Sequence, residues 1–292
     1  MEEKALRQHL LELVRLASCE LPEDVEKALQ AARDRESGRA RSTLDWMLKN
    51  AAEARRGSIP ICQDTGTLIF FVDHGPDLRP SLVERAAIEA VREATRRSFL
   101  RPNAVDAVSG KNSGDNIGRG SPFFHFHELE QAGQLRVRLL LKGGGSENCG
   151  VQYTLPDSSI QAARDLSGIK KCILDAALKA QGFGCAPGFL GVGVGGDRLS
   201  SYLESKEQFL RPLGDTNPDP QLAGIEQELL PKINELGIGP MGFGGATTLL
   251  GIKIGSRHRL PASFFVSVSY MCWAYRRRVM EWNQGEGAPR YA

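Results

Sequence analysis

Three glycine-rich stretches interrupt this chain and constrain its fold more than any other feature. They occupy residues 105–121, 182–196 and 237–245, in a chain of 292 residues with 32 glycines. Glycine is unfavourable in the interior of helices and strands, so each stretch is predicted to be an irregular connection. Functional groups concentrate on such connections. The sequence therefore predicts an α+β chain, helical in its N-terminal region, whose glycine-rich loops converge on a site.

The remaining segments show the periodicities of helices and strands. An N-terminal helix is indicated by apolar residues that share one face: Leu6, Leu10, Leu13, Val14 and Ala17. Further helices are predicted to begin at Pro22 and to cover residues 42–54, 80–99, 158–181 and 221–236. Short apolar runs predict strands at residues 68–72, 123–129, 135–142, 249–254 and 264–270. The short polar gap between the second and third of these runs is typical of a β-hairpin.

The composition excludes several classes of protein. The 37 basic and 35 acidic side chains nearly cancel, so general nucleic-acid binding is not expected. No apolar run approaches the length that spans a bilayer, and the N-terminal segment reads as an amphipathic helix and not as a secretory signal. We therefore expect a single cytoplasmic domain over residues 1–292, with neither nucleic acid nor membrane among its partners.

Cysteine carries the most informative chemistry in the sequence. The six thiols are Cys19, Cys62, Cys149, Cys172, Cys185 and Cys272. Without a secretory signal they are expected to stay reduced or to bind metal. Cys62, Cys185 and Cys272 lie in polar or glycine-rich surroundings, 123 and 87 residues apart, which excludes zinc ribbons, ferredoxins and redox dithiols. Their spacing alone leaves open that they are three unrelated buried thiols.

The sequence around these three thiols resembles a known family. The segments that carry the resemblance are PICQDTGT, LKGGGSENCG, GCAPGFLGVGVGGDR, GPMGFGGATTLLGIKI and HRLPASFFVSVSYMCWAYRR. In this order they resemble the signatures of the iron–sulfur hydro-lyase family, which contains class I fumarate hydratases and L-tartrate dehydratases. The resemblance covers nearly the whole chain. The length of the chain is similar to that of the separate α subunit of the two-subunit enzymes.

This resemblance implies a [4Fe–4S] cluster held by Cys62, Cys185 and Cys272. Thiolate sulfur is the ligand that such clusters require. Three protein ligands for four irons leave one iron not ligated by protein, which would act as a Lewis acid on a small dicarboxylic acid. The implied reaction is the reversible addition or removal of water, with fumarate and L-malate as the first substrate pair and tartrate as the alternative.

The resemblance also implies which residues meet the substrate. Gln63 and Asp64 are expected to reach the substrate or its hydroxyl group, although an aspartate here could instead cap its own turn. Gly145 is expected to offer backbone to a substrate carboxylate, with a tight turn as the alternative. Arg101 is expected to bind a carboxylate through its guanidinium fork, with a solvated helix end as the alternative. His258 is included among the substrate-binding residues, although the family histidine aligns with Leu260.

Three further patterns have structural interpretations. His125 and His127 alternate with phenylalanines and are predicted to share one face of a half-exposed strand. The arginines at 276–278 are predicted to form a basic surface or to face a partner. The run GVGVGGDR lacks the strand-before, helix-after context of a dinucleotide site, and it is interpreted as close-packed backbone beneath the cluster.

A partner is implied because the complete family site includes a β-type domain with further arginines, a lysine and a general base. No such segment is recognised before the sequence ends, soon after Cys272. We therefore expect a separate β subunit that completes the active site, in a dimer of αβ units. A non-catalytic iron–sulfur binding or sensing module and a zinc hydrolase remain as alternatives.

Overall fold

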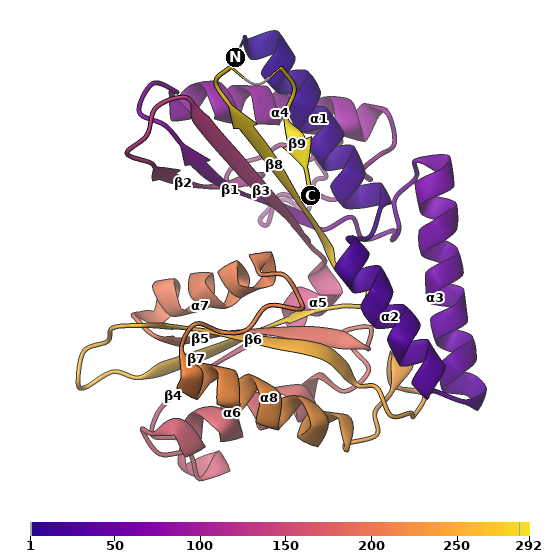
Figure 1. Cartoon of the computed structure of the whole chain (residues 1–292), viewed down its shortest axis with the longest axis vertical. Helices are drawn as coiled ribbons and strands as arrows, with labels where there is room; N and C mark the ends of the chain where they lie inside the picture. Colours follow the sequence, from indigo (N-terminus) through magenta and orange to yellow (C-terminus); the bar gives the residue numbers. More distant parts are fainter. Residues whose placement is uncertain (1, 286) are drawn as a thin grey trace. The chain divides into compact units, whose positions relative to one another are not determined.

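The computed structural model describes residues 2–285 and 287–292 and divides the chain into two compact units. Unit 1 combines the chain up to Pro22 with Lys49–Gly144 and Ala274–Ala292. Unit 2 combines Glu23–Leu48 with Gly145–Trp273. Each unit contains helices and one sheet, which confirms the α+β prediction (Figure 1). The expectation of one domain over residues 1–292 stays a prediction.

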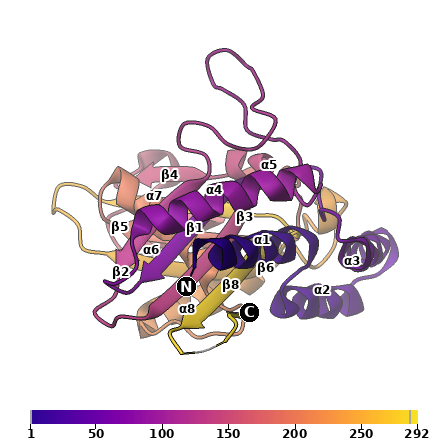
Figure 2. The same cartoon turned by 90° about the horizontal axis from the view of Figure 1, so that it is seen from above.

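Unit 1 is built on a five-stranded sheet in the order β2-β1-β3-β8-β9. Its strands are β1 (Thr67–His74), β2 (Phe123–Glu128), β3 (Gln134–Lys142), β8 (Arg276–Asn283) and β9 (Arg290–Tyr291). β2 runs parallel to β1, and the other neighbours are antiparallel. Helices α1 (Glu3–Cys19) and α4 (Pro80–Arg96) cover one face of this sheet, as Figure 2 shows.

The core of unit 1 lies between these two helices and the sheet. The apolar face predicted for the N-terminal helix is fully buried in α1, and it packs with the small buried residues of α4. Alternate residues of β1 (Leu68, Phe70 and Val72) belong to the same core. The helical period of α1 and the short apolar run at residues 68–72 therefore identified parts of this core correctly.

The predicted hairpin between β2 and β3 is wrong. Both strands exist at the predicted positions, but β1 lies between them, with Ile69 opposite Phe123 on one side and Leu140 on the other. A strand earlier in the sequence therefore intervenes, and the short gap cannot reveal it because strand pairing is decided by packing as well as by local spacing.

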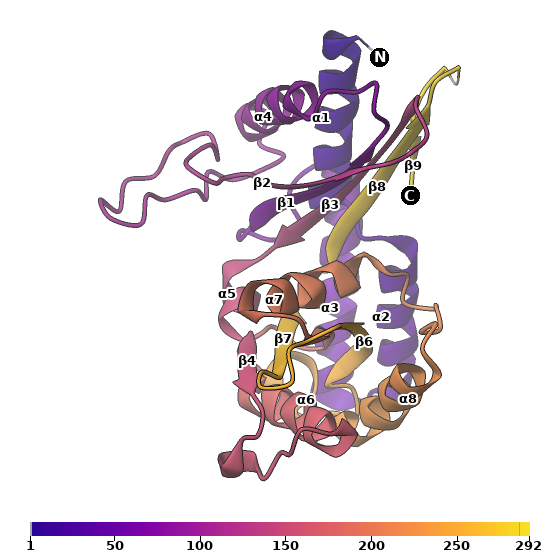
Figure 3. The same ribbon diagram turned by 90° about the vertical axis from the view of Figure 1, so that its left-hand side faces the viewer.

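The polar stretch at residues 105–121 is a loop, as predicted. It belongs to the connection from α4 to β2, which extends away from the sheet and helices of its own unit (Figure 3). Isolated bridges between Val105 and Asn112 and between Gly118 and Ser121 give the loop its internal order.

Unit 2 is built on a four-stranded sheet in the order β4-β7-β5-β6. Its strands are β4 (Val151–Thr154), β5 (Gly188–Gly195), β6 (Leu249–Arg257) and β7 (Phe265–Met271). Its helices are α2 (Glu23–Arg35), α6 (Leu166–Ala180), α7 (Arg198–Glu207) and α8 (Pro220–Asn234). In Figure 1, α6 and α8 lie on one face of the sheet and α7 lies on the other. Two further helices, α3 (Gly38–Gly57) and the short α5 (Gly144–Asn148), run through the boundaries between the units.

The second glycine-rich stretch is a central strand and not only a connection. All eight residues of β5 are buried, because Leu190, Val192 and Val194 face the core with α6 and α8. A Cβ atom added at Gly191 or Gly193 would lie 2.1 Å from a backbone carbonyl oxygen of α7. The alternation of glycine with valine therefore lets α7 pack against the main chain of β5.

Other element predictions are confirmed with shifted ends. The helix expected at 158–181 begins only at Leu166, because a short 3-10 turn, Ser158–Ile160, precedes it. The strand at Arg276–Asn283 and the helix α7 were not predicted. Among the described residues, no helix combines the length and the apolarity needed to cross a membrane.

Candidate active site

Cys62 lies in an anchored turn of unit 1 between α3 and β1. The backbone N–H of Ile61 donates to the carbonyl oxygen of Ser18 (3.1 Å), and Nδ2 of Asn50 donates to the carbonyl oxygen of Ile61 (2.8 Å). Ile61 is buried, whereas Cys62 is partly exposed. A fixed backbone therefore presents a thiol that a bound group can reach.

Asp64 joins remote parts of unit 1. Its Oδ2 accepts a hydrogen bond from the backbone N–H of Gly144 (2.7 Å), and its carbonyl oxygen accepts one from Nη1 of Arg276 (2.7 Å). Arg276 is 1% exposed and also donates to the carbonyl oxygen of Ala274 (3.3 Å). A buried guanidinium thus holds the turn that carries Asp64. The basic-surface interpretation is wrong for Arg276 and Arg277, because both arginines are buried within β8.

Arg101 stands beside the same turn because its backbone is held there. Oγ1 of Thr65 and Nδ2 of Asn116 donate to the carbonyl oxygen of Arg101, at 3.3 and 2.8 Å. Asn103 donates to Oγ1 of Thr65 (3.0 Å). Thr65 and Asn116 are buried, whereas Arg101 is exposed. The structure therefore fixes the main chain at Arg101 and leaves its guanidinium at the surface.

One open pocket of unit 1 brings three predicted site residues together. Its volume is about 470 Å³, and its lining residues are Gln63, Asp64, Arg101, Pro102, Asn103, Val105 and Asn112. An amide, a carboxylate and a guanidinium therefore face one space, and the base of the polar loop forms another part of its wall. This size and polarity suit a small charged ligand more than a large apolar one.

Cys185 and Cys272 lie close together at one end of the sheet in unit 2. β5 and β7 are antiparallel with Phe189 opposite Met271, so the residues before β5 meet the residues after β7. The backbone N–H of Trp273 donates to the carbonyl oxygen of Cys185 (3.2 Å). Cys185 has a φ of 57°, in the left-handed region that non-glycine residues rarely adopt. Backbone strain of this kind clusters at functional sites.

Tyr270 fills the space beneath the loop that carries Cys185. A Cβ atom at Gly184 would lie 2.3 Å from Cε1 of the tyrosine ring, and one at Gly188 would lie 2.2 Å from its hydroxyl oxygen. Two glycines of the GCAPG segment are therefore required by the ring. Burial raises the pKa of the Tyr270 hydroxyl, and the neighbouring Cys272, Cys149 and Cys185 raise it further.

Gly145 lies in the short helix α5, which follows β3 in the sequence. Gly145 is exposed and helps to line a second pocket of about 470 Å³, in unit 2, together with Cys149. The Sγ of Cys149 is 3.6 Å from the carbonyl oxygen of Gly145. The proposed contact between Gly145 and a substrate stays a prediction.

His258 is not brought to the two thiols of unit 2. It is exposed at the end of β6, and its carbonyl oxygen accepts a hydrogen bond from the backbone N–H of Gly196 (3.3 Å). Gly196 directly follows β5, whereas Cys185 precedes β5. The eight residues of β5 therefore separate His258 from Cys185, about 25 Å at the usual rise of a strand.

The histidines of β2 are placed as the sequence predicted. His127 is exposed and lies 3.6 Å from Asp73, and His125 stacks on Phe71. Among the described residues, no three His, Cys, Asp or Glu side chains form a group that could hold a metal ion. Among the described residues, no cysteine takes part in a disulfide.

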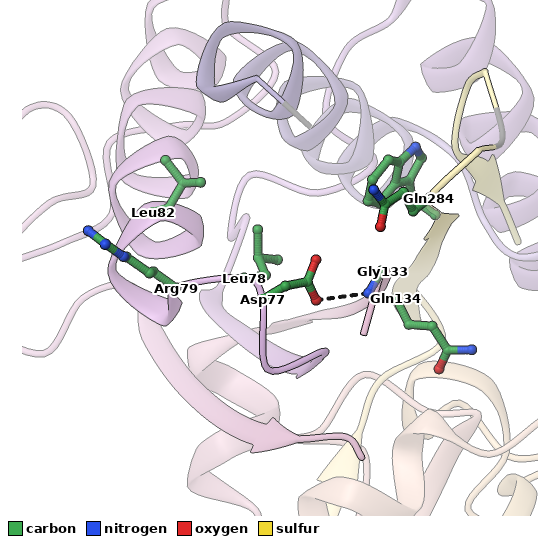
Figure 4. A pocket seen from close by; sticks show the side chains of 8 residues that line it. Asp77, Leu78, Arg79, Leu82, Gly133, Gln134 and Gln284 are labelled. Carbon is green, nitrogen blue, oxygen red and sulfur yellow. Dashed lines mark hydrogen bonds between the residues drawn. The ribbon is translucent and has the colours of Figure 1, made fainter. Parts of the chain in front are cut away.

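Another hollow of unit 1, of about 400 Å³, contains none of the predicted site residues (Figure 4). Its carboxylate, Asp77, accepts a hydrogen bond from the backbone N–H of Gly133 (2.8 Å) and so joins two turns. This arrangement has a structural explanation, and the hollow is not assigned to the site.

The sequence did not identify the residues that support the site. Thr65 stands within the recognised PICQDTGT segment, but its contact with Arg101 is made across 36 residues. Asn116 lies in the polar loop without any local signal of burial. Tyr270 is placed by the strand pattern, but a pattern cannot show that its hydroxyl is buried without a partner among the described residues.

The chain is similar to known proteins of one family. The family model described as fumarate hydratase (Fumerase) matches residues 7–281. A protein of Geobacillus stearothermophilus, provisionally named fumarate hydratase class I, is 46% identical over 277 residues, which are 93% of this chain and 54% of that protein. A Methanocaldococcus jannaschii protein, provisionally named L(+)-tartrate dehydratase subunit alpha, is 35% identical over 92% of this chain and 95% of its own length. The L(+)-tartrate dehydratase subunit alpha of Escherichia coli K12 is 32% identical over 90% of this chain and 86% of its own length.

The family match extends over most of the chain, so this chain belongs to the fumarate hydratase (Fumerase) family. This result confirms the resemblance inferred from the five sequence segments. The chain spans about half the length of the Geobacillus relative, but most of the length of the two tartrate dehydratase subunits.

Proposed function

We propose that this chain is the α subunit of a [4Fe–4S]-dependent hydro-lyase that interconverts fumarate and L-malate. The observation that carries the proposal is the pocket that Gln63, Asp64 and Arg101 share in a chain of this family. The name of the Geobacillus relative, at 46% identity, supports fumarate as the substrate. Tartrate is the second candidate, because two relatives of similar length are named as tartrate dehydratase subunits.

The proposed cluster ligands are Cys62, Cys185 and Cys272. Two observations on unit 2 fit an inorganic group: the strained backbone of Cys185 and the buried Tyr270 hydroxyl, which has no partner among the described residues. Thiolates are suitable donors for such a group. When bound through three thiolates, the cluster would supply a Lewis-acidic iron with an open position.

The other residues would bind and orient the substrate. Arg101 would hold a carboxylate with its planar fork, and its fixed main chain would set the position of that fork. Gln63 and Asp64 would hydrogen-bond the hydroxyl group that is added or lost. Because Asp64 already accepts a backbone N–H through Oδ2, its carboxylate is oriented before substrate arrives.

A separate β subunit is part of this proposal. The Geobacillus relative is nearly twice as long as the matched region, whereas the matched proteins named as α subunits are not. The β chain would supply further cationic groups and the general base, and the assembly would be a dimer of αβ units. We also propose a cytoplasmic location, where thiols stay reduced.

The ligand set is tested by replacing each thiol and measuring the visible absorbance after anaerobic reconstitution with iron and sulfide. Cys62→Ser, Cys185→Ser and Cys272→Ser are each expected to abolish the cluster absorbance. Cys19→Ser and Cys172→Ser are the controls, because both thiols are fully buried. An unchanged spectrum in one of the first three variants would remove that residue from the ligand set.

The activity is tested by anaerobic co-expression with a β-type chain. The absorbance change between malate and fumarate is followed and compared with that of tartrate. Turnover by the α chain alone would refute the division of the site between two chains. A reconstituted complex that holds a cluster but converts no hydroxy-diacid would instead support a binding or sensing module.

A further inference from the structure

The hydroxyl group of Tyr270 is the least explained polar group in unit 2. Tyr270 is 2% exposed, and its hydroxyl has no hydrogen-bond partner among the described residues. An unsatisfied buried hydroxyl is destabilising, so such groups usually have a partner. Tyr153, in the same core, shows the usual arrangement, because its hydroxyl donates to Oδ2 of Asp175 (2.6 Å).

Specific packing holds the Tyr270 ring in this position. The side chain lies against the main chain at Gly184 and Gly188, where no Cβ atom could be accommodated. In the sheet, Tyr270 pairs with Leu190, so its backbone is fixed within two strands. The hydroxyl therefore cannot be satisfied by a simple rotation towards solvent.

The Tyr270 ring lies against the loop that carries a cysteine. It contacts Gly184 and Gly188, which flank Cys185, and the carbonyl oxygen of Cys185 accepts a hydrogen bond from the backbone N–H of Trp273, next to Cys272. Cys185 and Cys272 are proposed cluster ligands. A thiol is a weak hydrogen-bond acceptor, whereas thiolate and sulfide sulfur carry the charge that makes a stronger one.

We infer that the Tyr270 hydroxyl donates a hydrogen bond to sulfur of the bound cluster, and that Tyr270 is thus a positioning residue that tunes and retains it. The inference rests on the proposed cofactor. The residue touches neither substrate nor reacting atoms in this assignment. Hydrogen bonds to cluster sulfur stabilise the more reduced, more negative state and raise the reduction potential.

The test compares Tyr270→Phe with Tyr153→Phe in the full chain, reconstituted anaerobically with iron and sulfide. Phenylalanine keeps the ring between Gly184 and Gly188 and removes only the hydroxyl. Tyr270→Phe is expected to lose iron to a chelator roughly tenfold faster than the wild type, which corresponds to one charge-assisted hydrogen bond. Its cluster is also expected to have a more negative reduction potential. Tyr153→Phe should match the wild type in both measurements.

Thermal unfolding of the cluster-free chain gives a readout that is independent of activity. Without the cluster, Tyr270→Phe should unfold at or above the wild-type temperature, because it removes an unpaired hydroxyl. Tyr153→Phe should unfold at a lower temperature, because Asp175 loses its donor. A merely structural tyrosine would instead lower the unfolding temperature in the Tyr270→Phe variant as well.

Two outcomes separate this inference from the proposed cofactor. A wild-type cluster with unchanged iron loss and potential in Tyr270→Phe would overturn the inference alone. A wild-type chain that takes up no iron and sulfide would overturn the proposed cofactor and this inference with it.

Discussion

The packing of α7 on the glycine face of β5 can be tested by Gly193→Ala. The added Cβ atom would lie 2.1 Å from the carbonyl oxygen of Ser201 and 2.8 Å from the backbone nitrogen of Ser205. Ordinary contacts begin near 3.4 Å, so α7 would have to move by about 1.3 Å. The obstructing atoms are main-chain atoms of a helix, and no side-chain rotation relieves the overlap.

The expected decrease in the free energy of unfolding has two parts. Overpacking in a close-packed core costs about 1–3 kcal/mol. Movement of α7 would also weaken the hydrogen bonds from Oγ of Ser201 to the carbonyl oxygen of Gly193 (3.1 Å) and between the Ser201 and Ser267 hydroxyls (2.8 Å), at about 1 kcal/mol each. We therefore expect Gly193→Ala to lower the free energy of unfolding by about 3–5 kcal/mol.

Gly251→Ala is the matched control, because Gly251 is a buried strand glycine in the neighbouring strand β6. Its Cβ atom would meet only Phe189 and Leu213 side chains, at 3.5 and 3.6 Å. This variant should be neutral or more stable by up to about 1 kcal/mol, from apolar burial and a less flexible unfolded chain. Urea unfolding of both variants checks the difference. Equal unfolding midpoints for the two variants would refute the packing argument.

Two further predictions concern unit 1 and the buried thiols. Asn116→Ala should lower the free energy of unfolding by about 2–4 kcal/mol in urea titrations, because the buried Asn116 side chain hydrogen-bonds Thr95, Arg101 and Asn103, at about 1 kcal/mol for each bond. In the active complex it should raise KM more than it lowers kcat, and an unchanged KM would contradict the role given to Arg101. Burial raises the pKa of Cys19 to about 11 and that of Cys172 to about 12, so at pH 8 neither thiol is ionised. Peptide mass spectrometry after iodoacetamide treatment should find the partly exposed Cys62 labelled and these two unlabelled until the chain unfolds; modification of either in the folded chain would count against the cause assigned to the shift.

Helices such as α1 and α4 were predictable because each has an apolar stripe that packs in one core, whereas α7 was not predicted. Strands β1, β2, β3, β6 and β7 were predictable individually, but β5 and β8 were not, and neither was the order of the strands. β1 separates β2 from β3, and β8 completes the same sheet from the far end of the chain. Three consecutive arginines concealed β8, because a sequence pattern cannot show that Arg276 finds carbonyl groups inside the fold.

Some residues that the resemblance implies for the site lie near one another within each unit, and their roles stay predictions. Gln63, Asp64 and Arg101 meet in one pocket, and Cys185 and Cys272 meet at one end of a sheet. The supporting residues were not predictable, because each is defined by a partner that is distant in sequence. Thr65 and Asn116 are ordinary polar residues until the fold places both on the carbonyl oxygen of Arg101.

The glycines of residues 184–193 have a different structural role from the one that the sequence suggested. Glycine was expected to mark irregular connections, yet in residues 184–193 it marks places where two parts of the fold approach closely. Gly191 and Gly193 admit the main chain of α7, and Gly184 and Gly188 admit the ring of Tyr270. The glycines on both sides of Cys185 contact the Tyr270 ring directly. The backbone of the loop that carries Cys185 is therefore held by this packing. A strained residue held in this way, with a φ of 57°, would be a preformed ligand for the proposed cluster.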